Sequence, residues 1–149
     1  MNKPELLAPA GNLEKLKMAI IYGADAVYIG GEKYGLRAAA GNFSFNEIKE
    51  GAKYAHDNGK KIYVTVNIIP HNEDLEGLEE YLTSLGDAGA DALIVSDPSV
   101  IMTAREVLPD MQLHLSTQAS NTNYMSARFW HSQGIKRIVL ARELSFEEI

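Results

Sequence analysis

The chain has 149 residues, of which 46% are hydrophobic and 23% are charged, and its formal net charge is -6. This composition is typical of a globular domain, and the negative charge disfavours a general grip on nucleic acid through a basic surface. The sequence contains no cysteine, which excludes a disulfide, a cysteine nucleophile and a thiolate metal site in this segment. The four histidines show no zinc-binding spacing, so no metal site is expected. With no apolar stretch long enough for a membrane span, we expect a cytoplasmic protein.

Short runs rich in Val, Ile, Leu and Tyr alternate with amphipathic helices along the chain. The runs predicted as strands are Glu5–Ala8, Ala26–Gly30, Lys61–Asn67, Ala92–Ser96, Gln112–Gln118 and Arg137–Arg142. Strands that alternate with helices predict a parallel sheet with right-handed crossovers.

The helices between these strands are indicated by apolar spacing and by end signals. Apolar residues recur at helical spacing in the groups Leu13, Leu16, Ile20; Phe45, Ile48, Ala52, Ala55; and Leu75, Leu78, Leu82, Leu85. Ser44 with Glu47 predicts a capping box, and Asp97 before Pro98 predicts a helix start. Four helices are predicted to end at Gly23, Gly59, Gly89 and Gly134. The segment 22–29 resembles 88–95 and, more loosely, 133–140, so the chain contains an internal repeat.

The predicted fold class is α/β, specifically a parallel β/α (TIM-like) barrel with about six of eight units present. Residues 145–148 resemble another capped helix start, and one turn of helix is not stable alone. Since eight units need roughly 200–250 residues, we expect residues 1–149 to be the N-terminal portion of one barrel domain. The rest of the domain and a C-terminal region would lie outside this sequence. The alternative is an open doubly wound sheet that is complete at this length.

Several predicted strands carry polar residues on one face, which is unusual because parallel strands are normally apolar on both faces. These polar or small residues alternate with apolar ones: Tyr28 and Gly30; Tyr63, Thr65 and Asn67; His114, Ser116 and Gln118. If this face points into the barrel, its polar groups must bond to each other, to water or to a ligand. The pattern therefore predicts either a binding site or an internal hydrogen-bond network.

The active sites of β/α barrels lie at the carboxyl ends of the strands, which selects the candidate binding residues. Asn67, Gln118, Asn121 and Arg142 follow predicted strands, and Arg37 lies in the long glycine-containing loop 31–43. Arg37 and Arg142 are candidates to bind a carboxylate or phosphate. Asn121, or Asn123, has the alternative role of capping the next helix.

Asp97, Glu143 and His114 are the candidate catalytic residues, because a hydrolase needs a carboxylate or imidazole at the barrel mouth. Each has an alternative. Asp97 can simply cap its helix, Glu143 can form a surface pair with Arg142, and His114 can belong to an internal network.

The sequence resembles the collagenase-like peptidases of family U32 over its whole length. The resemblance is carried by PELLAPAGNLE at 4–14, YIGG at 28–31, GLRA at 35–38, NF at 42–43, VNI at 66–68, IVSDP at 94–98, HLSTQA at 114–119 and VLAREL at 139–144. Some family members are said to degrade collagen. Others hydroxylate the wobble uridine of tRNA, ribosomal RNA or a ubiquinone precursor without oxygen, and the sequence is most similar to the tRNA branch.

This resemblance implies the principal hypothesis, a fragment of an RNA-modifying enzyme that forms 5-hydroxyuridine in tRNA with prephenate as a small carboxylate cosubstrate. Several hydroxylase members hold an iron–sulfur cluster through cysteines. This segment has none, so we expect no cofactor here, a possible cluster in the C-terminal region, and no activity of the fragment alone. The alternatives are a peptidase with a peptide substrate, and a non-enzymatic scaffold that self-associates through exposed strand edges.

Overall fold

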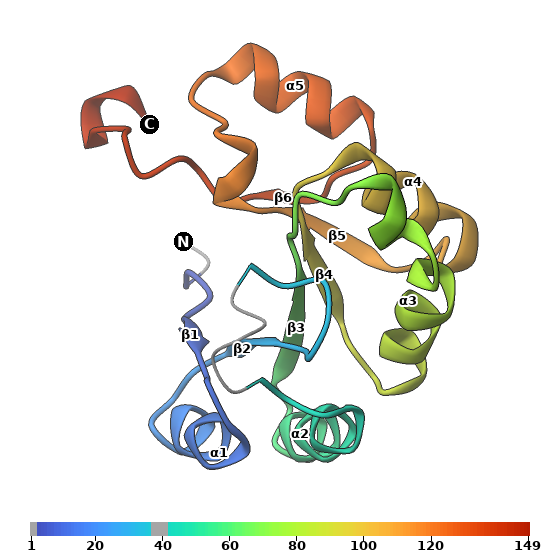
Figure 1. Ribbon diagram of the computed structural model, residues 1–149. Coiled ribbons are helices and arrows are strands. Elements are labelled where there is room, and N and C mark those ends of the chain that lie inside the picture. Colours follow the sequence, from blue (N-terminus) through green and yellow to red (C-terminus); the bar gives the residue numbers. More distant parts are fainter. Residues whose placement is uncertain (1–2, 37–41) are drawn as a thin grey trace.

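The computed structural model describes residues 3–36 and 42–149, and its centre is one parallel sheet. The sheet has six strands, each paired in parallel with the next along the chain. They are β1 (Leu7–Pro9), β2 (Ala26–Gly30), β3 (Lys61–Val66), β4 (Ala92–Val95), β5 (Gln112–Leu115) and β6 (Arg137–Ile138). Figure 1 shows that the sheet curls into a half-barrel. This confirms the predicted β/α barrel, whereas a doubly wound sheet reverses its strand order part-way.

The helices lie on the outside of the curve, and the C-terminal end of the chain lies on its open side (Figure 1). The α-helices are α1 (Leu13–Ile21), α2 (Phe45–Asp57), α3 (Leu78–Asp87), α4 (Pro98–Val107) and α5 (Tyr124–Ser132). Single 3-10 turns are η1 (Asn72–Leu75), η2 (Thr117–Ala119) and η3 (Phe146–Glu148). Within the described ranges, none of these helices has the length and apolar character needed to cross a membrane.

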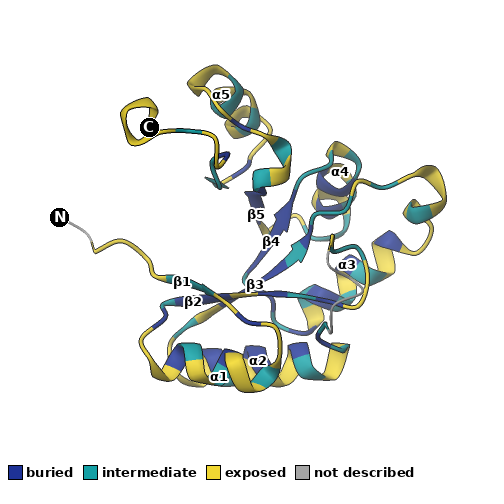
Figure 2. Cartoon of the chain, turned by 60° about the vertical axis from the view of Figure 1, so that its left-hand side comes forward, coloured by how far each residue is buried: buried dark blue, intermediate teal, exposed yellow. Residues whose placement is uncertain are grey.

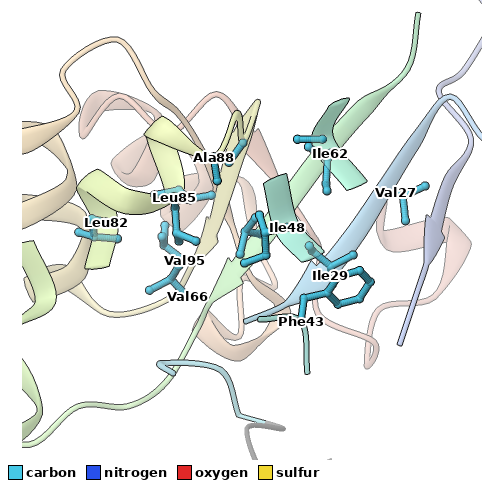
Figure 3. Packing of buried hydrophobic residues seen from close by; sticks show 14 of the residues in the cluster. Val27, Ile29, Phe43, Ile48, Ile62, Val66, Leu82, Leu85, Ala88 and Val95 are labelled. Carbon is cyan, nitrogen blue, oxygen red and sulfur yellow. The ribbon is translucent and has the colours of Figure 1, made fainter. Parts of the chain in front are cut away.

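The main core fills the layer between sheet and helices. Figure 2 shows that α1 and α2 bury the sides that face the sheet and expose the opposite sides. Val66 and Val95 of neighbouring strands and Leu82 and Leu85 of α3 are fully buried in one apolar cluster, part of which is drawn in Figure 3. Full burial of such a side chain contributes about 1.5–3 kcal/mol, so this layer accounts for much of the stability.

The predicted helix ends are confirmed by their hydrogen bonds and backbone angles. The Ser44 N–H donates to Glu47 Oε2 at 2.9 Å and the Glu47 N–H donates to Ser44 Oγ at 3.4 Å, which completes the capping box. Asp97 Oδ1 accepts from the Ser99 N–H at 2.8 Å at the start of α4. The four helix-ending glycines have positive φ, with Gly23 at 100° and Gly89 at 93°. Glycine adopts this left-handed conformation without the steric penalty that a Cβ brings.

Several predicted element boundaries are wrong by a few residues, including the first strand, which was predicted over Glu5–Ala8 and pairs over Leu7–Pro9. Leu75 belongs to η1, because Gly77 with φ at 80° separates that turn from α3. The fifth strand stops at Leu115, because Ser116 caps the tight turn η2 through the Gln118 N–H. The sixth strand was predicted to reach Arg142 but pairs only over Arg137–Ile138. The shifts of the fifth and sixth strands matter because these strand exits begin earlier and more of the rim consists of turns.

Candidate binding cavity

A cavity of about 490 Å³ opens inside the curve of the sheet, at the carboxyl ends of the strands. This lies within the size range of roughly 300–1,000 Å³ that is usual for small-molecule sites. Residues at period-two spacing from successive strands form its wall, as the alternation in the sequence predicted. They are Leu7 and Pro9 from β1, Tyr28 and Gly30 from β2, Thr65 from β3 and Ile94 from β4, with Asn67, Ser116 and Val139 just after β3, β5 and β6.

Asn67 joins three strand exits at the rim of this cavity. Its Nδ2 donates to Ser116 Oγ at 3.3 Å, and its Oδ1 accepts from the Leu36 N–H at 3.4 Å. Its backbone oxygen accepts from Ser96 Oγ at 3.2 Å. Ser116 is 4% exposed and its Oγ also accepts from the Gln118 N–H at 3.4 Å. Asn67 thus positions the loop after β2, and the exits of β4 and β5, around one space.

The polar part of the wall consists of amides, hydroxyls and one guanidinium. Asn67, Gln118 and Arg142, three of the predicted binding residues, all line the cavity. Of the lining residues that the structure describes, none is Asp, Glu or His, and Arg142 carries the only full charge. Arg142 is exposed, and no ion pair to it is found within residues 3–36 and 42–149. Such a wall favours a ligand with hydrogen-bonding edges and an anionic group.

The other two predicted binding residues have different outcomes. Asn121 is 1% exposed but does not line the cavity, and its Nδ2 donates to the Asn123 backbone oxygen at 3.4 Å. It is Asn123 that caps α5, by accepting from the Ser126 N–H at 2.9 Å. The Asn121 backbone oxygen accepts from the Ala141 N–H at 3.2 Å, so this residue supports the rim rather than forming the wall. Arg37 lies outside the described residues.

The three predicted catalytic residues do not meet at the cavity, and none of them lines it. Asp97 is engaged as the cap of α4 through the backbone and side chain of Ser99. Glu143 is exposed in the turn after β6. His114 is 2% exposed, and burial, followed by the nearby Arg137, lowers its pKa to about 4. No group of three or more His, Asp or Glu side chains able to hold a metal occurs in the described part of the chain.

Below the cavity, at the amino ends of the strands, a separate polar cluster bridges the first and last strands. Tyr63 donates to the Glu5 carboxylate at 2.9 and 3.0 Å, and Arg137 forms an ion pair with Glu5. The His114 ring meets the Tyr63 ring edge-on, with centroids 4.7 Å apart. Burial raises the pKa of Glu5, but the hydrogen bonds from Arg137 and Tyr63 outweigh it and the pKa is lowered overall. Burial, and then the Glu5 carboxylate, raise the pKa of Tyr63 to about 12.

Both predicted roles of the polar strand face, an internal network and a binding site, are therefore found, at different positions along the barrel axis. Tyr63 and His114 belong to an internal network, whereas Thr65, Asn67 and Ser116 reach the cavity. The sequence interpretation missed the partners Glu5 and Arg137. The available signal was the same period-two spacing, because Glu5 precedes Leu7 by two residues on the inward face.

The family model described as peptidase family U32 matches residues 11–149. The chain belongs to peptidase family U32. The "tRNA hydroxylation protein P1" of Bacillus subtilis is 58% identical to it over 147 residues, which cover 99% of this chain and 35% of that protein. The "23S rRNA 5-hydroxycytidine C2501 synthase" of Escherichia coli is 42% identical, over 97% of this chain and 22% of that protein. The chain thus spans about a third or less of the length of these relatives.

A solved U32 peptidase has the same fold, with a TM-score of 0.74 at 14% identity over 94% of this chain and 61% of the solved chain. At this identity the likeness concerns the fold alone. It agrees with the curled parallel sheet described above.

Proposed function

We propose that the full-length protein hydroxylates a pyrimidine of RNA, namely the wobble uridine of tRNA, and that this chain contributes the cavity that binds the reacting base. The proposal rests on the wall of that cavity, which offers amides, hydroxyls and one arginine. It is supported by the similarity to proteins named for hydroxylation of tRNA and of 23S rRNA. The two relatives are named for hydroxylation of different RNAs, and this shared reaction favours a site that recognises a pyrimidine ring.

In this proposal Asn67 and Gln118 bond the edge of the base. An amide offers both a donor and an acceptor, and a uracil edge presents an alternating pattern of the two. Arg142 binds an anionic group, either a phosphate of the RNA or the carboxylate of a small cosubstrate such as prephenate, because a guanidinium pairs with both in a bidentate manner. Arg142 is suited to this because it lines the cavity without an ion pair to any described residue.

Replacing C5–H of uracil by C5–OH is a two-electron oxidation of the base, so the full-length protein requires both an acceptor of two electrons and a donor of the oxygen atom. The residues of this chain do not fit an iron–sulfur cluster, because the chain contains no cysteine to bind one. We therefore place any cluster in the remainder of the full-length protein. The role of the present segment is to bind and orient the base and to hold an anion beside it.

The peptidase alternative has no comparable support in this segment. Activation of water for peptide hydrolysis commonly uses a carboxylate, an imidazole or a metal at the cavity. Asp97 caps a helix, His114 is buried below the cavity, and Glu143 does not line it.

The test is complementation with the full-length protein in a strain that lacks it and any paralogue. Mass spectrometry of tRNA nucleosides measures 5-hydroxyuridine. We expect the wild type to restore it and Arg142→Ala to reduce the initial rate by about tenfold or more, because a charge-assisted hydrogen bond contributes about 1.5–3 kcal/mol. Arg128→Ala, on the exposed surface of α5, is the matched control. Failure of the wild type to restore the nucleoside refutes the proposal.

A further inference from the structure

One wall of the cavity is apolar, and its largest member is an aromatic ring with no evident structural task. Leu7 and Pro9 of β1 lie beside Tyr28 of β2 in this wall. Tyr28 is 36% exposed, although its neighbours Val27 and Ile29 are 0% and 1% exposed. The second strand of the half-barrel therefore presents an aromatic side chain to the cavity. Large exposed apolar surface of this kind inside a cavity commonly marks a binding site.

The surroundings of Tyr28 fix its backbone and leave its ring unengaged. Its backbone oxygen accepts from the Ala10 N–H at 3.0 Å, and it pairs in register with Pro9 and with Tyr63. In the described ranges its hydroxyl has no hydrogen bond and its ring makes no stacking contact.

Tyr34, Tyr63 and Tyr81 differ in this respect. The Tyr34 ring packs against Tyr81 at 4.9 Å, and Tyr63 donates to Glu5 and contacts His114. The rings of Tyr34, Tyr63 and Tyr81 pack against other side chains, whereas the Tyr28 ring makes no such contact within the described ranges. This contrast indicates a ring that is available to a ligand.

We propose that Tyr28 is the surface on which the flat ring of the target pyrimidine stacks, an inference that rests on the proposed function. The polar part of the cavity wall, which contains Asn67 and Gln118, then faces the polar edge of the base. Proteins that act on a base in RNA or DNA extrude it into a pocket, stack it on an aromatic or apolar side chain and read its edge by hydrogen bonds. Stacking is tolerant of the base type because every base has a π face, so Tyr28 orients the ring while the amides select it.

The occupant of this wall is the base rather than the anionic cosubstrate. Among the described lining residues, the charge needed by an anion comes from Arg142, which follows β6 and does not belong to β1 or β2. Among the described residues, the apolar wall consists of Leu7, Pro9 and Tyr28, and none of these carries a positive charge. A neutral ring fits such a wall at a lower desolvation cost than a carboxylate does.

The experiment measures binding of the purified full-length protein to two anticodon stem-loop RNAs by fluorescence anisotropy. One RNA carries uridine at the target position, and the other is abasic there. The wild type should prefer the uridine RNA, and Tyr28→Ala should weaken binding of that RNA by about 5- to 150-fold while changing the abasic RNA little. Tyr28→Phe should retain the preference, because it keeps the ring. Tyr22→Ala, which removes an 80% exposed tyrosine outside the cavity, is the matched control.

The outcomes separate the two proposals. If the wild type binds both RNAs equally well, the cavity does not bind the base and the proposed function of this segment fails. If the wild type discriminates and Tyr28→Ala discriminates equally well, the stacking role is refuted while the proposed function stands. If Tyr28→Ala weakens both RNAs by the same factor, with an unchanged melting temperature, the ring contacts the RNA elsewhere than at the target base and the inference is again wrong.

Discussion

Tyr63→Phe tests the polar cluster at the amino ends of the strands. The Tyr63 side chain is 2% exposed, and its hydroxyl donates to both oxygens of Glu5. The substitution removes this donor and keeps the ring that contacts His114. A hydrogen bond to a charged group contributes about 1.5–3 kcal/mol. Glu5 retains Arg137 and is 24% exposed, so water replaces part of the loss. We therefore expect the free energy of unfolding to fall by about 1–2 kcal/mol.

Urea unfolding followed by the fluorescence of the single tryptophan, Trp130, measures this loss. The folded-state pKa of Glu5 is lowered from 4.5, so the stabilisation by its carboxylate is fully present above pH 4.5 and disappears as the pH falls through the folded-state value. The cost of Tyr63→Phe should shrink over the same window. In a Glu5→Gln background the cost should also be smaller at neutral pH. An undiminished cost in that background would show that the Tyr63–Glu5 hydrogen bond is not what stabilises the cluster.

Three further predictions concern stability and the candidate residues. Burial lowers the pKa of His114 to about 4, so the free energy of unfolding should decrease by up to about 3 kcal/mol as the pH falls from 6.5 to 4. An imidazole that titrates near 6.5 by NMR contradicts this. Leu82→Ala should cost about 2–5 kcal/mol in urea unfolding, against less than about 0.5 kcal/mol for Met102→Ala, which is 63% exposed. Asp97→Asn should leave hydroxylation by the full-length protein intact, because asparagine also caps helices, and a complete loss in the nucleoside assay would make Asp97 catalytic.

Sequence periodicity predicted the alternation of strands and helices because it depends on local rules, but it left a doubly wound sheet as an alternative to the barrel. Val64 and Val66 alternate with Thr65 and Asn67, and this alternation alone assigns one set to the helix layer and the other to the barrel interior. The helix ends were equally readable, since the signals at Ser44 are contained within four residues. Boundaries at the strand exits were less accurate, because the turn after Leu115 depends on hydrogen bonds that Ser116 makes in the folded state.

The candidate site was only partly predictable, because the depth of a residue along the barrel axis depends on register and curvature. His114 and Ser116 share one face of the predicted fifth strand, yet His114 is buried in the lower cluster and Ser116, just after the observed strand, lines the cavity. The ion pair between Glu5 and Arg137 joins residues 132 positions apart, and no local pattern specifies that distance. Tyr28 was assigned to the interior by its spacing, but its unengaged ring is apparent only once the neighbouring strands are placed.

The two ends of the barrel interior are thus chemically opposite for a physical reason. At the amino ends, the charges of Glu5 and Arg137 satisfy each other, and with Tyr63 they close the interior between the first and last strands. This partly exposed ion pair, with the hydrogen bond from Tyr63, links the two strands at that end. At the carboxyl ends, no ion pair of Arg142 and no stacking contact of the Tyr28 ring is found among the described residues, and in our proposal a ligand supplies both interactions. It follows that a substitution of Tyr63 should change stability, whereas a substitution of Thr65, two residues further along the same strand, should change ligand binding.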